Sequence, residues 1–191
     1  MPVTIHANTG STLFDVGAGT PGRTAMGNRL TGVLAVNEDL RSVAKLLNID
    51  GRVVSTNGGK TFYMGNSSSM SVVNFRDNAR AENLRLAMND LALVNVFGGA
   101  VTASMTRVAN GGAFRAAIRQ TAGLWANGAW DQLHVGESAG SYGAYVLEDG
   151  RLEVLGDHNH DAAYVGKSAN ATRRSVGMLV QKGGVYRHTG T

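Results

Sequence analysis

One stretch of the sequence decides the expected fold: residues 145–155, which read Tyr-Val-Leu-Glu-Asp-Gly-Arg-Leu-Glu-Val-Leu. Two short runs of β-forming residues flank the pair Asp149-Gly150. Both residues of an Asp-Gly pair tolerate the positive φ angles of a tight two-residue turn. The stretch therefore predicts a β-hairpin, in which Tyr145–Glu148 pairs antiparallel with Arg151–Leu155.

Two further segments repeat this pattern on either side. Near the N-terminal third, Arg52–Thr56 and Lys60–Met64 flank Asn57-Gly58-Gly59, and a hairpin is expected there. Near the C-terminus, Val176–Val180 and Val185–His188 flank Lys182-Gly183-Gly184. The first 20 residues alternate weakly between apolar and polar side chains and predict one or two short strands.

The middle of the chain is expected to be helical. Leu84, Ala87, Met88, Leu91 and Val94 recur at helical spacing within residues 77–97, and Gly98-Gly99 would end that helix. A second helix is predicted over 112–126. Its buried face would comprise Phe114, Ala117, Ile118 and Trp125. A short helix is expected over 38–47, with Asn37 as its N-cap.

The order of strands, helices and strands predicts an α+β fold, with antiparallel hairpins and two or three helices in the middle of the chain. At 191 residues the chain forms a single domain, residues 1–191. A subdivision into a mixed α/β core, 1–130, and a β-rich part, 131–191, is the alternative.

The composition favours a protein that is packed against other protein. Charged residues make up 17% of the chain and hydrophobic residues 43%, with 26 glycines. A surface poor in Lys and Glu loses little side-chain entropy when a partner covers it. No apolar run is long enough to cross a membrane. The net charge of +4 is spread out, and Arg173-Arg174 is the only adjacent basic pair, so nucleic acid is not the expected partner.

Two motifs point to enzyme chemistry. Gly136-Glu137-Ser138-Ala139-Gly140 fits the pattern G-x-S-x-G and resembles the signature of carboxylesterases of the α/β-hydrolase fold. That resemblance implies Ser138 as nucleophile, with His158 and Asp157 as the remaining triad candidates. Gly17-Ala18-Gly19-Thr20-Pro21-Gly22 matches G-x-G-x-x-G, but Gly27 and Gly32 interrupt the helix that a dinucleotide site needs, so no cofactor is expected there.

A histidine pair suggests a metal site between chains. His158 and His160 lie at i and i+2, so an extended chain presents both imidazoles on one side. Three chains around an axis supply an octahedral shell of imidazole nitrogens, which suits iron, nickel or zinc. Asp157 and Asp161 could orient the rings.

The segment from His158 to Ser168 also resembles the H-x-H-D-x-x-Y element of tail-fibre proteins of tailed bacteriophages. In trimeric fibres of that kind, paired histidines from three chains can bind a metal on the axis. The resemblance implies His158 and His160 as ligands and Tyr164 as a packing residue at the trimer interface.

These observations predict a phage virion structural protein, such as a capsid, decoration, head-fibre or tail component. It would act by self-assembly, with a trimer favoured, and would bind other virion proteins. Its place would be the virion, after synthesis in the host cytoplasm. Two alternatives remain: a serine hydrolase using Ser138, and a module that binds glycans or a host surface through aromatic residues. Candidates for the latter are Trp125, Trp130, Tyr142 and Tyr145.

Overall fold

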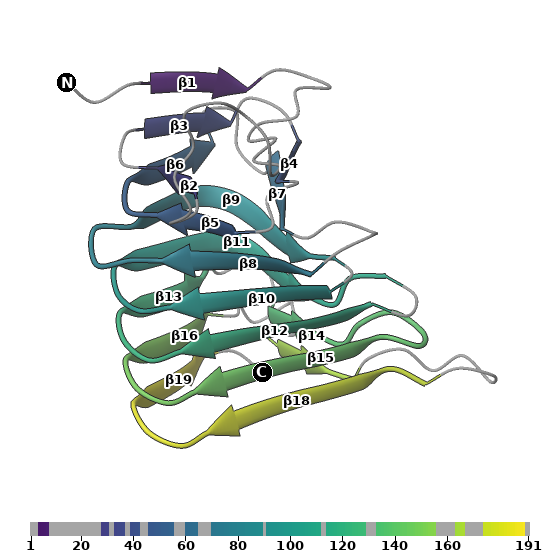
Figure 1. Ribbon diagram of the computed structural model, residues 1–191. Helices are drawn as coiled ribbons and strands as arrows, with labels where there is room; N and C mark the ends of the chain where they lie inside the picture. The colour runs from purple at the N-terminus through teal and green to yellow at the C-terminus, as the bar shows by residue number, and fades with distance from the viewer. Residues whose placement is uncertain are drawn as a thin grey trace.

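The protein is built from parallel β-strands that stack along one axis (Figure 1). The computed structural model describes residues 4–7, 28–30, 33–36, 39–42, 46–55, 60–64, 70–89, 91–111, 114–128, 133–155, 163–166 and 174–189. Within these ranges there is no helix, and the paired strands run parallel. The predicted α+β fold with antiparallel hairpins is therefore wrong.

Seven strands form the front sheet, which faces the viewer in Figure 1. From one end of the stack to the other, these strands are β18 (Val176–Gln181), β15 (Tyr142–Leu147), β12 (Arg115–Gln120), β10 (Leu91–Val96), β8 (Ser71–Phe75), β5 (Leu46–Ile49) and β2 (Asn28–Leu30).

The second sheet has twelve strands and forms two sides of the stack. Its main path, here the back side, comprises β1 (Thr4–Ala7), β3 (Val33–Val36), β6 (Arg52–Ser55), β9 (Arg80–Met88), β11 (Ala100–Val108), β13 (Leu124–Asn127), β16 (Arg151–Leu155) and β19 (Val185–Thr189). Its branch, here the third side, adds β4 (Leu40–Ser42), β7 (Lys60–Met64), β14 (Leu133–Val135) and β17 (Ala163–Val165) to the second halves of β9 and β11.

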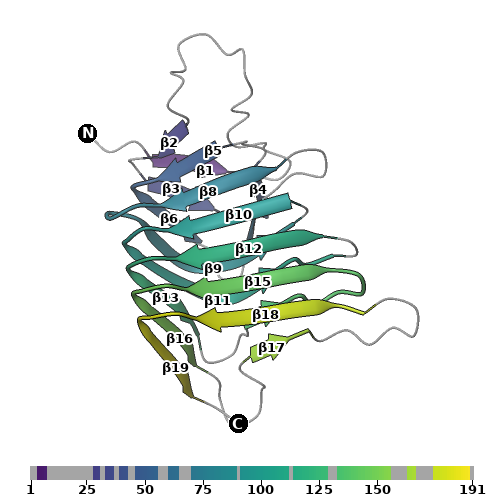
Figure 2. The ribbon, with the colours of Figure 1, turned by 60° about the horizontal axis from the view of Figure 1, so that its bottom comes forward.

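The chain visits the three sides in turn, so each coil lays its strands beside those of the coil before it (Figure 2). This arrangement is a parallel β-solenoid. In two coils a single strand serves both the back and the third side. β9 pairs with β6 over Arg80–Glu82 and with β7 from Leu84 onward, and it bends at Asn83, whose φ is 58°. The register against β11 shifts at this bend, which is a β-bulge.

Successive coils differ in length. On the back side Arg80 lies beside Ala100, Ala100 beside Leu124, Leu124 beside Arg151, and Arg151 beside Val185, which are intervals of 20, 24, 27 and 34 residues. The repeat is therefore regular in space and irregular along the sequence. A search for a fixed period cannot find it.

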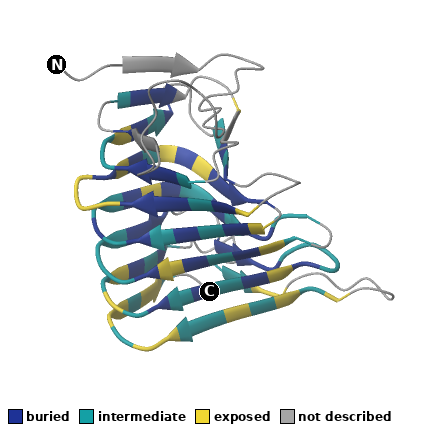
Figure 3. Ribbon diagram, viewed as in Figure 1, coloured by how far each residue is buried: buried dark blue, intermediate teal, exposed yellow. Residues whose placement is uncertain are grey.

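The interior forms because alternate side chains of each strand point inward. β10 and β15 both alternate between exposed or half-buried and buried positions (Figure 3). At the centre, the ring of Trp125 meets Phe75 at 5.9 Å and Tyr145 at 6.2 Å, both edge-on. These three side chains come from β8, β13 and β15, so the aromatic contacts join the front sheet to the back side across the core.

Several buried polar side chains inside the solenoid are hydrogen-bonded to one another. The Thr106 hydroxyl oxygen accepts hydrogen bonds from Trp125 Nε1 and Asn127 Nδ2, each at 3.1 Å. The Tyr145 hydroxyl donates to Gln120 Oε1 at 2.7 Å, and Gln120 Nε2 donates to the Gly123 and Arg151 carbonyls. Because unpaired buried polar groups are costly, these bonds fix how the front sheet meets the back side.

Glycines make the corner between front and back. Gly99, Gly123, Gly150 and Gly184 each precede a back-side strand and have φ between 68° and 88°. A Cβ on Gly150 would lie 2.6 Å from the Gly123 carbonyl oxygen, so the stacked corners leave no room for a side chain. Both the positive φ and the close approach require glycine here.

All three predicted helices are strands. Residues 77–97 contain β9 and β10, 112–126 contain β12 and most of β13, and 38–47 contain β4 and the start of β5. The supposed helical stripe fails at Leu91, which is 49% exposed, whereas Leu84, Leu86 and Met88 are buried at strand spacing. An apolar pattern of this length fits both the helical period of about 3.6 residues and the strand period of about two, and the strand period was the correct one.

The predicted hairpins contain strands at the expected places but with the wrong partners. β15 belongs to the front sheet and β16 to the back side, and β18 and β19 divide in the same way. β6 and β7 do not pair with each other, since both pair with β9. The glycine turn between such strands changes the direction of the chain from one sheet to the other, and each strand finds its partner a whole coil away.

Candidate binding surfaces

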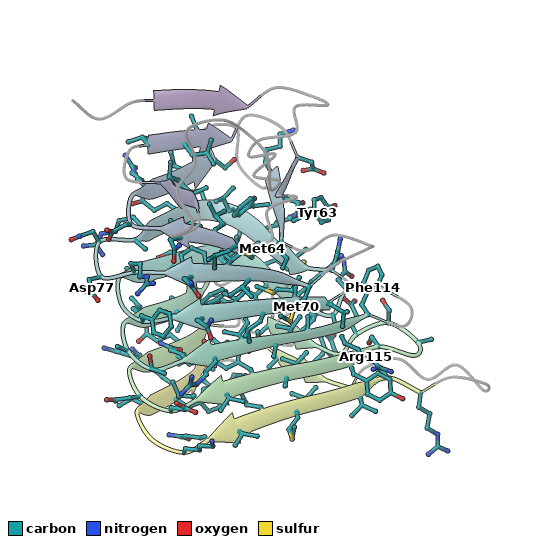
Figure 4. All side chains as sticks on the ribbon, in the orientation of Figure 1. Tyr63, Met64, Met70, Asp77, Phe114 and Arg115 are labelled. Atoms are coloured by element: carbon teal, nitrogen blue, oxygen red, sulfur yellow. The ribbon has the colours of Figure 1, made fainter. Side chains whose placement is uncertain are left out.

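Large apolar side chains gather on the outer surface of the front sheet. Outward positions of neighbouring strands align in rows: Leu91, Arg115, Tyr142 and Val176 form one row, and Leu93, Ala117, Ala144 and Met178 form the next. We call the following six residues the apolar face: Met70, Leu91, Leu93, Tyr142, Val176 and Met178. Five of them are 47–60% exposed, with Leu93 half-buried. Met70 and Arg115 are labelled in Figure 4.

The apolar face surrounds a shallow hollow of about 450 Å³. Ala117, Gly143 and Ala144 lie on its floor, and their small size leaves space between the taller side chains Leu91 and Met178. Arg115 is the one charged residue among those that line the hollow, and its guanidinium carbon lies 5.6 Å from the centroid of the Tyr142 ring. The hollow therefore offers apolar burial with a single cation at its border.

The back side and the corner that leads to it are charged instead. Arg52 Nη2 lies 2.6 Å from Glu82 Oε2, and Arg187 Nη1 lies 3.6 Å from Glu153 Oε1. At the corner, Glu148 accepts a hydrogen bond from Arg119 at 2.8 Å and contacts Lys182 at 3.5 Å. Each of these pairs joins neighbouring coils, so the charged surface is neutralised locally, whereas the large side chains of the apolar face are exposed among the described residues.

Glu148 and Tyr145, both near this corner, have shifted pKa values. The hydrogen bond from Arg119 holds the pKa of Glu148 below its usual 4.5, and Lys182 acts in the same direction. Burial raises the pKa of Tyr145 well above its usual 10.0, so its hydroxyl stays protonated and keeps donating to Gln120.

A polar pocket of about 200 Å³ opens on the third side. We call it the third-side pocket. It lies over β7, β9 and β11, and its polar lining residues are Asp39, Thr61, Tyr63, Arg85, Arg107 and Asn110. Tyr63 is labelled in Figure 4. The sequence analysis did not single out any of these six residues.

A histidine and a carboxylate meet beside this pocket. His134 Nδ1 lies 2.7 Å from Glu137 Oε2, and Arg107 Nε lies 3.4 Å from the same oxygen. The ring of Tyr164 stacks edge-on against His134, with ring centroids 4.8 Å apart. The His134 side chain is only 3% exposed. This cluster therefore fastens the bend after β14 to the third side.

The candidate catalytic residues are only partly described. Ser138 lies in the bend between β14 and β15, and its carbonyl oxygen accepts a hydrogen bond from the Ser141 amide at 3.0 Å. β15 begins at Tyr142, so a strand follows the motif where a nucleophile elbow has a helix. Asp157 and His158 lie outside the described residues.

The candidate metal ligands His158 and His160, and the loop Gly17–Gly22, also lie outside the described residues. Within the part of the chain that the structure describes, no three acidic or histidine side chains are grouped to hold a metal ion. The trimer-axis site stays a prediction. Metal analysis of the purified protein should give about one ion per three chains, lost in His158→Ala.

Of the aromatic residues proposed for glycan binding, the three that the structure describes do not form a surface cluster. Trp125 and Tyr145 are fully buried in the core, while Tyr142 is 52% exposed on the apolar face. Trp130 lies outside the described residues. The signal for the apolar face was present in the sequence, since Leu91 and Leu93 alternate outward from Ala92 and Val94, but the helical interpretation concealed it.

The class of protein that this geometry defines is a parallel β-solenoid with one apolar side. Comparison with known protein families, with curated proteins and with solved structures gives no match. Among the described residues, no helix has the length and apolar character needed to span a membrane.

Proposed function

We propose that this chain is a structural protein that assembles with copies of itself through the apolar face. The observation that carries the proposal is the exposure of five large apolar side chains at the front sheet, four of which lie in two adjacent rows. Exposed apolar patches of this kind mark association sites in soluble proteins. We propose a second copy of this chain as the occupant. It presents the same apolar face, so it fits this surface better than a partner that binds through opposite charge.

Burial of apolar surface is the driving force in this proposal. Covering such side chains yields about 25 cal/mol per Å² of apolar area. The rows stand on hydrogen-bonded parallel strands, so few backbone degrees of freedom are lost on association. The described residues that line the hollow include no acid, histidine or serine, and this apolar lining favours docking over chemistry.

The setting that we propose for this assembly is a phage particle, with the trimer as the favoured oligomer. Its support is the resemblance of residues 158–168 to the tail-fibre element, together with the low share of charged residues, 17%. An elongated solenoid presents the same side of every coil in one direction, which suits lengthwise contact between subunits.

The test is the native mass in solution, measured over a range of concentrations by sedimentation or light scattering. We expect the wild-type chain to form an oligomer and the double variant Leu91→Lys, Met178→Lys to be a monomer. Both side chains are about half exposed, so the change places two cations on the face without disturbing the core.

The matched control is Val185→Lys, which changes an exposed valine, 56% accessible, at the start of β19 on the back side. It should leave the oligomer intact. A wild-type protein that stays monomeric at high concentration, or a control that dissociates it as the double variant does, would count against the proposal.

A further inference from the structure

The third-side pocket owes its shape to one small residue between two large ones. In register across three strands, Ala87 of β9 lies between Tyr63 of β7 and Arg107 of β11. Leu86 and Met88, the neighbours of Ala87 along β9, are buried in the core, so Ala87 faces the opposite side of the strand. The missing bulk at Ala87 leaves a depression whose walls are an aromatic ring and a guanidinium group.

Arg85 adds a second guanidinium group to the same pocket. It lies two residues before Ala87 on β9, so its side chain leaves the same face of the strand. Among the described residues, Arg85 has no ion pair or hydrogen bond, and it is exposed. Arg107 is different, because Glu137 neutralises it from the side of the bend.

Hydrogen-bonding groups complete the lining. Asp39 Oδ1 accepts a hydrogen bond from the Thr61 amide at 2.8 Å, which holds that carboxylate at the border of the pocket. Asn110 follows β11 and contributes an amide side chain. The pocket therefore combines two guanidinium groups with a carboxylate acceptor and a neutral amide.

We propose that the third-side pocket binds a single sugar acid, that is, a pyranose ring that bears a carboxylate. The carboxylate pairs with Arg85, whose planar fork of N–H donors matches it. The ring hydroxyls donate to Asp39 and bond with Asn110, and the apolar ring face packs on Tyr63.

The size of the pocket supports one ring. Sites for drug-sized ligands measure about 300–1,000 Å³. A volume of about 200 Å³ is smaller than these and leaves room for one monosaccharide unit, with any neighbouring units outside. The pocket lies on a different side from the apolar face, so sugar binding does not depend on assembly.

Calorimetric titration of the full chain tests this inference with three probes: D-glucuronate, D-glucose and acetate. D-glucuronate carries the carboxylate and the hydroxyls, whereas D-glucose lacks the former and acetate lacks the latter. We expect D-glucuronate to bind at least about tenfold more tightly than either, because D-glucose loses the charged hydrogen bond to Arg85 and acetate loses the hydrogen bonds of the ring hydroxyls. The variant Arg85→Gln should weaken D-glucuronate by a factor of about ten to a hundred.

The matched control is Arg80→Gln, the same substitution at an exposed arginine of the same strand but outside the pocket. It should bind D-glucuronate as the wild type does, and circular dichroism should show both variants folded. If acetate binds as tightly as D-glucuronate, the sugar ring is not recognised. If D-glucose binds as tightly as D-glucuronate, the carboxylate is not recognised. The absence of any binding, or an equal loss in the control, would overturn the site.

Discussion

At the scale of single residues, the corner glycines are the positions that tolerate change least. Gly150 combines a φ of 88° with a would-be Cβ 2.6 Å from the Gly123 carbonyl oxygen. A left-handed conformation costs an L-residue about 1–2 kcal/mol, and the close contact adds to that cost. We therefore expect Gly150→Ala to lower the free energy of unfolding by about 2 kcal/mol or more, measured by denaturant titration.

Gly128→Ala is the control for this substitution. Gly128 follows β13, and the nearest atom to a Cβ there is the Ala103 carbonyl oxygen at 3.9 Å, an ordinary contact. The free energy of unfolding of this variant should stay within about 0.5 kcal/mol of the wild type. Equal losses in the two variants would show that corner stacking is not the cause.

At the scale of elements, the contact between two coils at Glu148 makes stability depend on pH. The hydrogen bond from Arg119 lowers the pKa of Glu148 in the folded chain below 4.5, so the folded state favours the carboxylate. The unfolded chain binds the proton more readily. This stabilisation is present above pH 4.5 and is lost as the pH falls through the folded pKa.

The measurement is the thermal midpoint of the wild type and of Glu148→Gln as a function of pH. The wild-type advantage should be constant near neutral pH and shrink as the pH falls below 4.5. In an Arg119→Gln background the same comparison should lose most of this pH dependence. An advantage that persists in acid would contradict the role of the pair.

Element positions could be read from the sequence, but their partners could not. The turn at Asp149-Gly150 was found because its residue types permit positive φ, and Gly150 has that conformation. Whether the next strand folds back or turns a corner depends on a partner a coil away, such as Val185 beside Arg151. No local sequence pattern indicates which residues pair across such a separation in sequence.

The candidate sites show the same division. The alternation along the sequence indicates that Leu91 and Leu93 point outward. The apolar face becomes visible only when the outward positions of β12, β15 and β18 are aligned with them. The third-side pocket depends on register between Tyr63, Ala87 and Arg107, which lie 24 and 20 residues apart in sequence. The composition indicated that part of the surface packs against other protein, but it did not indicate which part.

At the scale of the whole molecule, each coil contacts the coils before and after it, so stability should accumulate coil by coil. Removal of residues 175–191 deletes β18 and β19 and uncovers the edges of β15 and β16. We expect the shortened chain to keep its parallel strands but to unfold at a lower temperature.

Far-ultraviolet circular dichroism during heating measures both quantities. The β signal per residue should stay close to that of the full chain, and the thermal midpoint should fall, because the inner side chains of β15 and β16 lose the partly buried Leu179 and Tyr186. Complete loss of the signal at low temperature would mean that the coils fold only together.

The common direction of the strands has one more consequence. Asn48, Asn74 and Asn95 occupy the same position on three successive front strands; Asn74 Nδ2 donates to Asn48 Oδ1 and Asn95 Nδ2 donates to Asn74 Oδ1, each at 2.9 Å. A residue type that recurs at one position in three coils thus becomes a row along the axis. A side-chain group that a compact fold would place at a single site is repeated here along the axis of the solenoid. The length of the row is set by the number of coils that carry the group.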